Sequence, residues 1–249
     1  MERYPRILPT PKGRSHKFAN PKRRPPFRTH HFTPPTPRAV RVEPTMDEWV
    51  TSEAQLAAIY GEPCLASIKK EVDFLHPHYR RMIEASPFAI LATVGPEGLD
   101  ASPRGDEPGF VTVEDEHTLL MPDRRGNNRT DSLKNIVRDP RVGLLFLLPG
   151  LGETLRVNGT ARISVDEALI QRFEMDGKLP RSVLVIHVET VFFQCARAII
   201  RSKIWEQGSH VDKSKLPSVG TMLSDLSECE IEAEGYDREL PDRLKSTLY

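Results

Sequence analysis

Residues 121–136 read MPDRRGNNRTDSLKNI and join an expected strand, His117–Met121, to an expected helix. The helix is indicated by Leu133, Ile136 and Val137, which fall at the i, i+3 and i+4 positions of one apolar face. The Thr-Asp pair just before them supplies a side chain for the N-cap. The polar middle of the stretch is therefore a loop between two regular elements.

That loop contains three arginines, two asparagines and one glycine. Gly126 lets the backbone approach a ligand closely, and the free N–H groups at the start of the following helix favour an anion. The planar guanidinium groups of Arg124 and Arg125 match the oxygen atoms of a phosphate. A solvated turn before a helix would have the same composition, so the flanking sequence has to distinguish the two.

The charge of the chain is unevenly distributed. All 249 residues together hold 35 Lys or Arg and 35 Asp or Glu, a formal net charge of zero. Residues 1–45 hold eleven basic residues, two acidic residues and ten of the 22 prolines. We expect a disordered basic, proline-rich tail there, because such a sequence cannot maintain a helix or a sheet. A nucleic-acid-binding arm, an organellar presequence and a leader without a role stay open, and we favour the last; we do not expect nucleic acid as a partner.

Three further features limit the class of protein. The three cysteines, Cys64, Cys195 and Cys229, are odd in number and lack metal-like spacing, which favours reduced thiols and a cytoplasmic location. No apolar run reaches the length of a membrane span, so we expect no membrane partner. His76 and His78 lack a third ligand nearby, and we expect no metal site.

Helical patterns come first in the folded part. Trp49, Leu56 and Ile59 form an apolar stripe that stops at Gly61-Glu62-Pro63, and we expect further helices over 66–75 and 77–85. At Ser86-Pro87 the apolar period changes from 3.6 to 2. Strands are then expected over residues 88–94, 99–102, 110–113, 117–121, 142–148, 155–163 and 183–193.

This order indicates a fold that is mainly β with flanking helices. Six or more antiparallel strands on short turns, with helices at strand ends, are typical of a small closed or partly open barrel. We expect a domain over 46–205 that includes the N-terminal helices. Residues 206–249 are acidic, with short helical patterns, and form an extension that packs on the barrel or is partly disordered.

The arrangement resembles the FMN-binding split β-barrels related to pyridoxamine 5′-phosphate oxidase, over about residues 86–205. The resemblance lies in the order of hairpin, Ser-Pro-Arg-Gly (102–105), hairpin, Asp-Arg-Arg-Gly-Asn-Asn (123–128), helix and Asp-Pro-Arg-Val (139–142). Ser-Pro-Arg-Gly-Asp with Arg-Arg-Gly-Asn-Asn is closer to a mostly bacterial subgroup of these flavoproteins. The family is homodimeric, with flavin sites at the subunit interface.

The resemblance implies a set of cofactor-binding residues. Consecutive basic residues hold the FMN phosphate in the family and match Arg124 and Arg125, with Asn128 nearby. Arg104 could add a third phosphate contact or pair with Asp106, and we favour the flavin role. Polar contacts to the flavin fall around Glu153 and Thr154, and a C-terminal strand pair from the partner subunit closes the ring site; that pair matches 193–205 and so includes Arg201 and Trp205.

Two motifs of the true pyridoxine phosphate oxidases are absent. The sequence lacks their Arg-x-x-x-Leu-Lys pattern before the arginine loop and their C-terminal Arg-x-His pair. The resemblance therefore implies an FMN-dependent oxidoreductase that acts on another small-molecule substrate, with no catalytic residue that we can name. Because deazaflavin and haem proteins share the barrel, a non-catalytic flavin- or haem-binding protein is the alternative.

Overall fold

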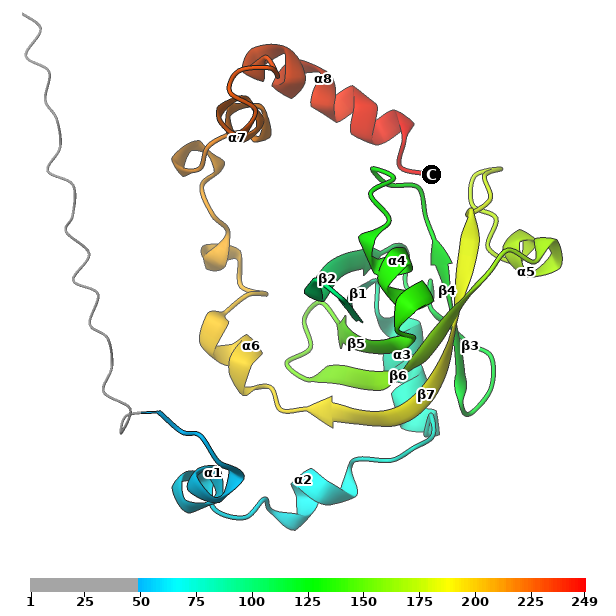
Figure 1. Ribbon diagram of the computed structural model, residues 1–249, viewed down its shortest axis with the longest axis vertical. Coiled ribbons are helices and arrows are strands. Elements are labelled where there is room, and N and C mark those ends of the chain that lie inside the picture. The colour runs from blue at the N-terminus through cyan, green and yellow to red at the C-terminus, as the bar shows by residue number, and fades with distance from the viewer. Residues whose placement is uncertain (1–48) are drawn as a thin grey trace, which may run out of the picture. The chain divides into compact units, whose positions relative to one another are not determined.

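The computed structural model describes residues 49–249 (Figure 1). The expected tail over 1–45 lies outside the described residues. The chain divides into two compact units, Met1–Ile59 and Tyr60–Tyr249. The described part of the first unit ends within α1 (Glu53–Tyr60), a helix without a buried residue.

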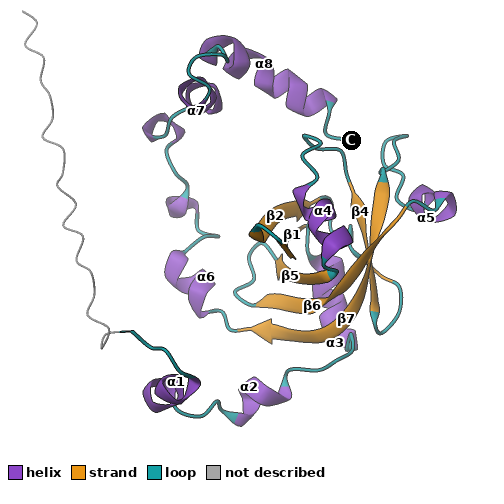
Figure 2. Cartoon of the chain, viewed as in Figure 1, coloured by secondary structure: helices purple, strands orange, loops and turns teal. Residues whose placement is uncertain are grey.

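The second unit is built on one antiparallel sheet of seven strands, which curls into a split β-barrel (Figure 2). The order across the sheet is β2-β1-β5-β6-β7-β4-β3. The prediction of a mainly β fold with flanking helices is confirmed. The strands are β1 (Phe88–Gly95), β2 (Gly98–Gly105), β3 (Thr112–Val113), β4 (Thr118–Asp123), β5 (Arg141–Leu147), β6 (Thr154–Ser164) and β7 (Ser182–Gln194).

Helices lie before, between and after the strands. None of the helices in the described residues is long and apolar enough to cross a membrane. Besides α1, the helices are α2 (Leu65–Lys69), α3 (Pro77–Ala85), α4 (Asp131–Arg138), α5 (Glu167–Gln171), α6 (Arg197–Ser202), α7 (Val219–Leu226) and α8 (Ala233–Ser246), with two short 3-10 turns between α6 and α7.

One apolar core fills the inside of the curled sheet. Alternate residues of β1, β5 and β6 are buried, as the period of two along a strand requires. Phe146, Leu91 and Ile186 are fully buried in this core, and Ile83 of α3 joins them from outside the sheet. Each such side chain contributes about 1.5–3 kcal/mol when it leaves water. A smaller cluster lies under α5, where Phe173 packs with Leu120 and Val183.

Helix α4 has Thr130 as its N-cap residue, as its sequence predicts, but Thr130 has a positive φ of 56° and its side chain makes no capping hydrogen bond. The expected apolar face is wrong in one member, because Val137 is 77% exposed. Asn135 is buried instead, and its Nδ2 donates a hydrogen bond to Thr93 Oγ1 of β1 at 3.1 Å. Gly95 leaves the room that this amide needs, since a Cβ there would lie 2.1 Å from Asn135 Oδ1.

Two expected elements differ from the structure. The helix over 66–75 ends at Lys69, because Val72 exchanges two backbone hydrogen bonds with Val191 of β7. The strand over 110–113 is reduced to Thr112 and Val113, although Phe110 and Val111 are buried in the core. In both places a tertiary contact replaces the regular element that the local pattern indicates.

The C-terminal region also corrects an expectation. Where the resemblance implies a strand pair over 193–205, the structure has the end of β7 followed by helix α6. Residues 206–249 contain α7 and α8, which pack on each other, and the last residue returns to the sheet: Tyr249 Oη donates a hydrogen bond to Asp106 Oδ1 at 2.7 Å.

Strands β6 and β7 form the longest ladder of the sheet, and its register shifts between Asn158 and Gly159. A Cβ at Gly159 would lie 1.9 Å from the carbonyl oxygen of His187, a backbone atom that cannot move away cheaply. The close approach at the bulge therefore requires glycine.

We predict that Gly159→Ala lowers the free energy of unfolding by about 1–3 kcal/mol or more, because the added methyl group forces the two strands apart. Urea unfolding followed by circular dichroism measures the change. Gly208→Ala is the matched control, since a Cβ at Gly208 meets no atom within 4 Å. Equal stabilities for the two variants would contradict this account of the bulge.

Candidate functional site

The arginine loop forms one side of a pocket of about 630 Å³, which we call the arginine-loop pocket. It lies where the ends of β2 and β4, the first turn of α4 and the start of β7 meet. Four of the predicted site residues line it, and the three others do not. The four are Arg104, Arg124, Arg125 and Asn128.

Arg124 is held firmly by its neighbours. Its Nε donates to Asp106 Oδ2 at 2.8 Å, and its Nη1 donates to the carbonyl oxygen of Phe173 at 2.5 Å. The Asp106 side chain is only 1% exposed. Removal of either partner leaves a buried group without its hydrogen bonds, so this pair stabilises the loop in addition to lining the pocket.

Arg104 forms an ion pair with Asp123 and not with Asp106, the expected partner in the alternative to a flavin role. Its Nη1 donates to Asp123 Oδ1 at 3.1 Å, whereas Asp106 takes Arg124 as its partner. The Nε of Arg104 is buried and has no hydrogen-bond partner among residues 49–249. Since buried donors are almost always satisfied, this N–H is free for an acceptor from outside the chain.

Arg125 is the most available cation of the loop. Its side chain is exposed and has no hydrogen-bond or ion-pair partner within the described part of the chain. Asn128 has positive φ and accepts a hydrogen bond through Oδ1 from Arg181 Nη1 at 2.9 Å. Arg181 precedes β7 directly, so strand pairing brings a further arginine to the loop.

The two buried aspartates have opposite pKa shifts. Burial on its own raises the pKa of Asp106, but hydrogen bonds from Tyr249, the Glu107 amide and Arg124 outweigh it and lower the pKa. Burial raises the pKa of Asp123, and the nearby charge of Arg104 offsets only part of that effect. The arginines are therefore already partly neutralised, and Arg125 is the one in the loop that is not.

Thr154, Arg201 and Trp205 lie at the other end of the β6–β7 ladder. The hydroxyl of Thr154 donates to Gln194 Oε1 at 3.2 Å, and the residue is buried. Trp205 Nε1 donates to the carbonyl oxygen of Leu151 at 2.9 Å. Arg201 is exposed on α6. Within one chain these three residues do not meet the arginine loop.

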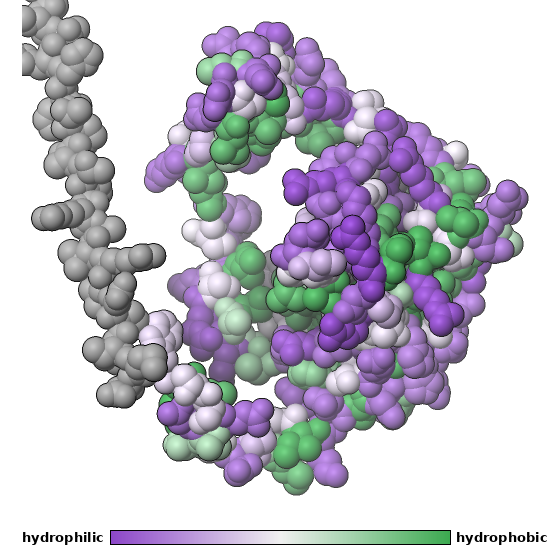
Figure 3. All heavy atoms as spheres, in the orientation of Figure 1, coloured by the Kyte–Doolittle hydropathy of each residue, from purple (hydrophilic) through white to green (hydrophobic). Residues whose placement is uncertain are grey.

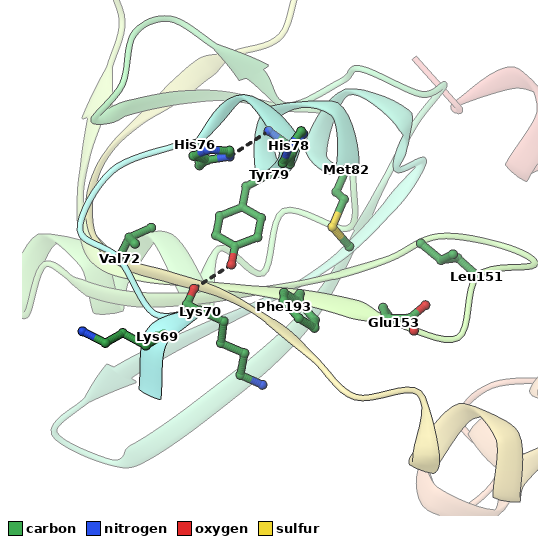
Figure 4. Close-up of a pocket in the computed structure, with 10 residues that line it drawn as sticks. All are labelled: Lys69, Lys70, Val72, His76, His78, Tyr79, Met82, Leu151, Glu153 and Phe193. Atoms are coloured by element: carbon green, nitrogen blue, oxygen red, sulfur yellow. Dashed lines mark hydrogen bonds between the residues drawn. The ribbon is translucent and has the colours of Figure 1, made fainter. Parts of the chain in front are cut away.

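A second pocket, of about 510 Å³, lies beside this group, and we call it the Tyr79 pocket (Figure 4). Tyr79 and Met82 of α3 reach towards Phe193 of β7, while Leu151 and Glu153 close the other side (Figure 4). The Tyr79 hydroxyl donates to the carbonyl oxygen of Lys70 at 2.6 Å, and burial raises the pKa of this tyrosine. The inner wall is apolar and suits a flat ring.

The two pockets lie at opposite ends of strand β7. Ser182 lines the arginine-loop pocket, and Phe193 lines the Tyr79 pocket. At about 3.3 Å per residue, eleven steps of strand separate them by roughly 35 Å. That length is the upper limit for an extended strand, and since the two pockets share no lining residue they are separate cavities of a single chain.

Sequence reasoning missed Arg181, Lys178 and Tyr249, which lie near the loop. A third pocket of about 310 Å³, the Lys178 pocket, contains all three together with Arg124, Arg125, Leu179 and Pro180. Only the pairing of β4 with β7 and the return of the C-terminus bring them there, and neither has a local signal. Within residues 49–249 no three His, Cys, Asp or Glu side chains gather as metal ligands.

The fold is a split barrel with a pocket at its arginine loop. Residues 75–195 match the family described as pyridoxamine 5′-phosphate oxidase. This part of the chain belongs to the pyridoxamine 5′-phosphate oxidase-related family of split barrels. The matched segment contains the whole sheet and the arginine loop but ends before Arg201 and Trp205.

Three bacterial proteins are among the solved structures that the chain matches. HupZ from Group A Streptococcus is 22% identical, with 48% of this chain and 94% of that chain covered and a TM-score of 0.41. General stress protein 26 from Bacillus anthracis is 19% identical, with 45% and 88% covered and a TM-score of 0.36. A protein related to general stress protein 26 from Clostridium acetobutylicum is 13% identical, with 47% and 86% covered and a TM-score of 0.37. No curated protein matches the chain.

The Asp106–Arg124 pair predicts a pH-dependent stability. A lowered carboxyl pKa stabilises the fold above the ordinary Asp value of 3.8, and the contribution disappears as the pH falls through the folded-state pKa. We predict that Asp106→Asn lowers the free energy of unfolding by about 1–3 kcal/mol at pH 7. The deficit relative to the unsubstituted protein should shrink below pH 3.8, as melting curves measure. Asp225→Asn removes the same charge from an exposed site and is the control; a deficit that does not change with pH would contradict the pairing.

Proposed function

We propose that the protein is an FMN-dependent oxidoreductase of the pyridoxamine 5′-phosphate oxidase-related superfamily that acts on a small-molecule substrate. The arginine-loop pocket binds the flavin phosphate. When bound, the flavin supplies the redox chemistry, and the protein residues bind it, orient it and exclude water from it. Catalysis of this type requires no nucleophile or metal site from the chain.

The unsatisfied Nε of Arg104 is the observation that carries the proposal. A buried donor without a protein partner among residues 49–249 requires an acceptor, and a phosphate oxygen in this pocket would supply one. The exposed guanidinium of Arg125 lies on the same pocket. Arg104 comes from strand β2 and Arg125 from the loop after β4, and together they offer a phosphate both a buried N–H and an uncompensated charge.

A second copy of the chain completes the site in this proposal. Thr154, Arg201 and Trp205 lie near the end of β7 that is opposite the arginine loop, so in this proposal they serve the flavin of a partner subunit. The region after β7 exposes many large apolar side chains, which favours burial against another copy (Figure 3). They include Ile200, Ile204, Trp205, Val211, Leu216, Met222 and Leu226.

The enzyme and the alternative binding protein differ in one observable. An oxidoreductase passes electrons on, so its bound flavin is reduced by a nicotinamide dinucleotide and then reoxidised by oxygen or by the substrate. A flavin-storage protein holds the cofactor without turnover.

We place the enzyme in the cytoplasm, where reduced nicotinamides are available and where the three free, exposed cysteines stay as thiols.

The first test concerns the phosphate. We predict that Arg125→Ala lowers the affinity for FMN by about one to two orders of magnitude, since one charge-assisted contact contributes about 1.5–3 kcal/mol. Riboflavin has the ring but no phosphate, and its affinity should stay within about twofold. Fluorescence titration measures both ligands. Arg125→Lys should recover part of the loss, because a point charge replaces the planar fork.

Arg125 suits this test better than Arg124, whose bonds to Asp106 and Phe173 also stabilise the loop. Arg238→Ala, on the exposed surface of α8, removes the same charge away from all three pockets and is the control. Equal losses of FMN and riboflavin in Arg125→Ala would show that the phosphate is bound elsewhere.

The second test concerns the shared site. Arg125→Ala and Trp205→Ala chains, each defective alone, are co-expressed with different tags. If each flavin contacts both subunits, a mixed dimer has one doubly defective site and one intact site. With random pairing, about a quarter of all sites should bind FMN with normal affinity. If one chain provides the whole site, no intact site forms, and recovery would stay at the level of the single variants.

A further inference from the structure

Three cations next to the arginine loop have no carboxylate partner in the described part of the chain. Arg104, Arg124 and Arg129 are paired with aspartates, so their charges are compensated. The unpaired cations are Arg125, Lys178 and Arg181, and all three line the Lys178 pocket.

The Lys178 pocket adjoins the arginine-loop pocket. Arg124, Arg125 and Arg181 line both, so the two cavities meet at a wall of guanidinium groups. Arg125 and Lys178 have no ion-pair partner among residues 49–249, and Arg181 is offset only by the charge of Asp123, with which it forms no ion pair. Cations that converge in this way repel one another, and a bound anion relieves that repulsion. A phosphate in the arginine-loop pocket would compensate Arg125 and Arg181 in part, and it would leave Lys178 on the far side without a partner.

The other walls of the Lys178 pocket are apolar or aromatic. Leu179 and Pro180 form one side, and the ring of Tyr249 forms another. Tyr249 is held in place by its hydrogen bond to Asp106, and the Arg124 guanidinium lies 5.6 Å from the centre of its ring. A fixed aromatic side chain beside uncompensated cations is the combination that recognises a phosphate joined to a flat heterocycle.

We infer that the Lys178 pocket is a second subsite, which takes a further phosphate and the base attached to it. The complete site then accepts a diphosphate-linked dinucleotide, and flavin adenine dinucleotide is the flavin form that fits both pockets. The inference rests on the proposed function only for the phosphate in the arginine-loop pocket. The Lys178 pocket itself recognises the chemistry of a nucleoside diphosphate, with or without a flavin.

Titration of the full chain with FMN, flavin adenine dinucleotide and ADP tests the inference. The dinucleotide should bind at least about tenfold tighter than FMN, and ADP should bind alone. Lys178→Ala should lower the affinities for the dinucleotide and for ADP by about tenfold. The affinity for FMN should stay within about twofold, since this lysine lines only the second subsite. Lys215→Ala removes the same charge from an exposed 3-10 turn and should change no affinity.

Tyr249 provides an independent variant of the same experiment. Tyr249→Ala removes the aromatic wall and should weaken ADP more than Tyr249→Phe, which loses only the hydroxyl group. Equal affinities for FMN and the dinucleotide, together with an unchanged ADP affinity in Lys178→Ala, would overturn the second subsite while the proposed flavin function stands. Binding of ADP through Lys178 without binding of either flavin would instead support the subsite and refute the proposed function.

Discussion

The antiparallel ladder between β6 and β7 is the constraint on which most of the structure depends. It joins residues 154–164 to residues 183–194 and places both strands at the centre of the sheet. The core side chains of both strands, such as Val157 and Ile186, pack on its inner face. Strand β7 carries the arginine-loop pocket at its first residue, Ser182, and the Tyr79 pocket near its end, at Phe193. The ladder therefore keeps these two pockets apart within one chain, and the proposed flavin site uses a second copy to bring them together.

The charges at the arginine loop are arranged for two purposes. Asp106 holds Arg124 in place, and Asp123 holds Arg104 in place. Both carboxylates lose most of their contact with water in doing so. Burial raises the pKa of Asp123 even with its arginine nearby, so desolvation outweighs the attraction at this carboxylate. Arg125 differs, because it is exposed and has no such partner within residues 49–249. Orientation thus comes from the paired arginines, and net positive charge comes from the unpaired ones.

The sequence predicts the order of strands well because hydrophobic periodicity is local. The expected strands over 88–94, 142–148 and 155–163 agree closely with β1, β5 and β6. Predictions fail where a distant partner decides the outcome. Val72 pairs with Val191 of β7 instead of continuing the expected helix. Asn135 replaces Val137 on the buried face of α4, because Thr93 accepts its hydrogen bond and Gly95 leaves room for its side chain.

The candidate site divides in the same way. Arg124 and Arg125 can be recognised from their own loop, since glycine and a helix start accompany them in the sequence. The partners of each arginine cannot be recognised from the loop, because Asp106, which binds Arg124, lies 18 residues away in the chain. Arg181 and Tyr249 reach the loop only through strand pairing and the return of the C-terminus. No local pattern contains that information.

The C-terminal segment connects the two ends of the sheet from outside. It leaves β7 at Gln194, next to the Tyr79 pocket, and returns at Tyr249 beside the arginine loop (Figure 1). Most of the large apolar side chains along this path are exposed, while its last residue bonds to the buried Asp106. In the proposed dimer, a second copy that covers those side chains would fix the path of the segment and with it the position of Tyr249. The aromatic wall of the Lys178 pocket would then depend on assembly, so that the dimer interface and the phosphate site stabilise each other through one stretch of chain.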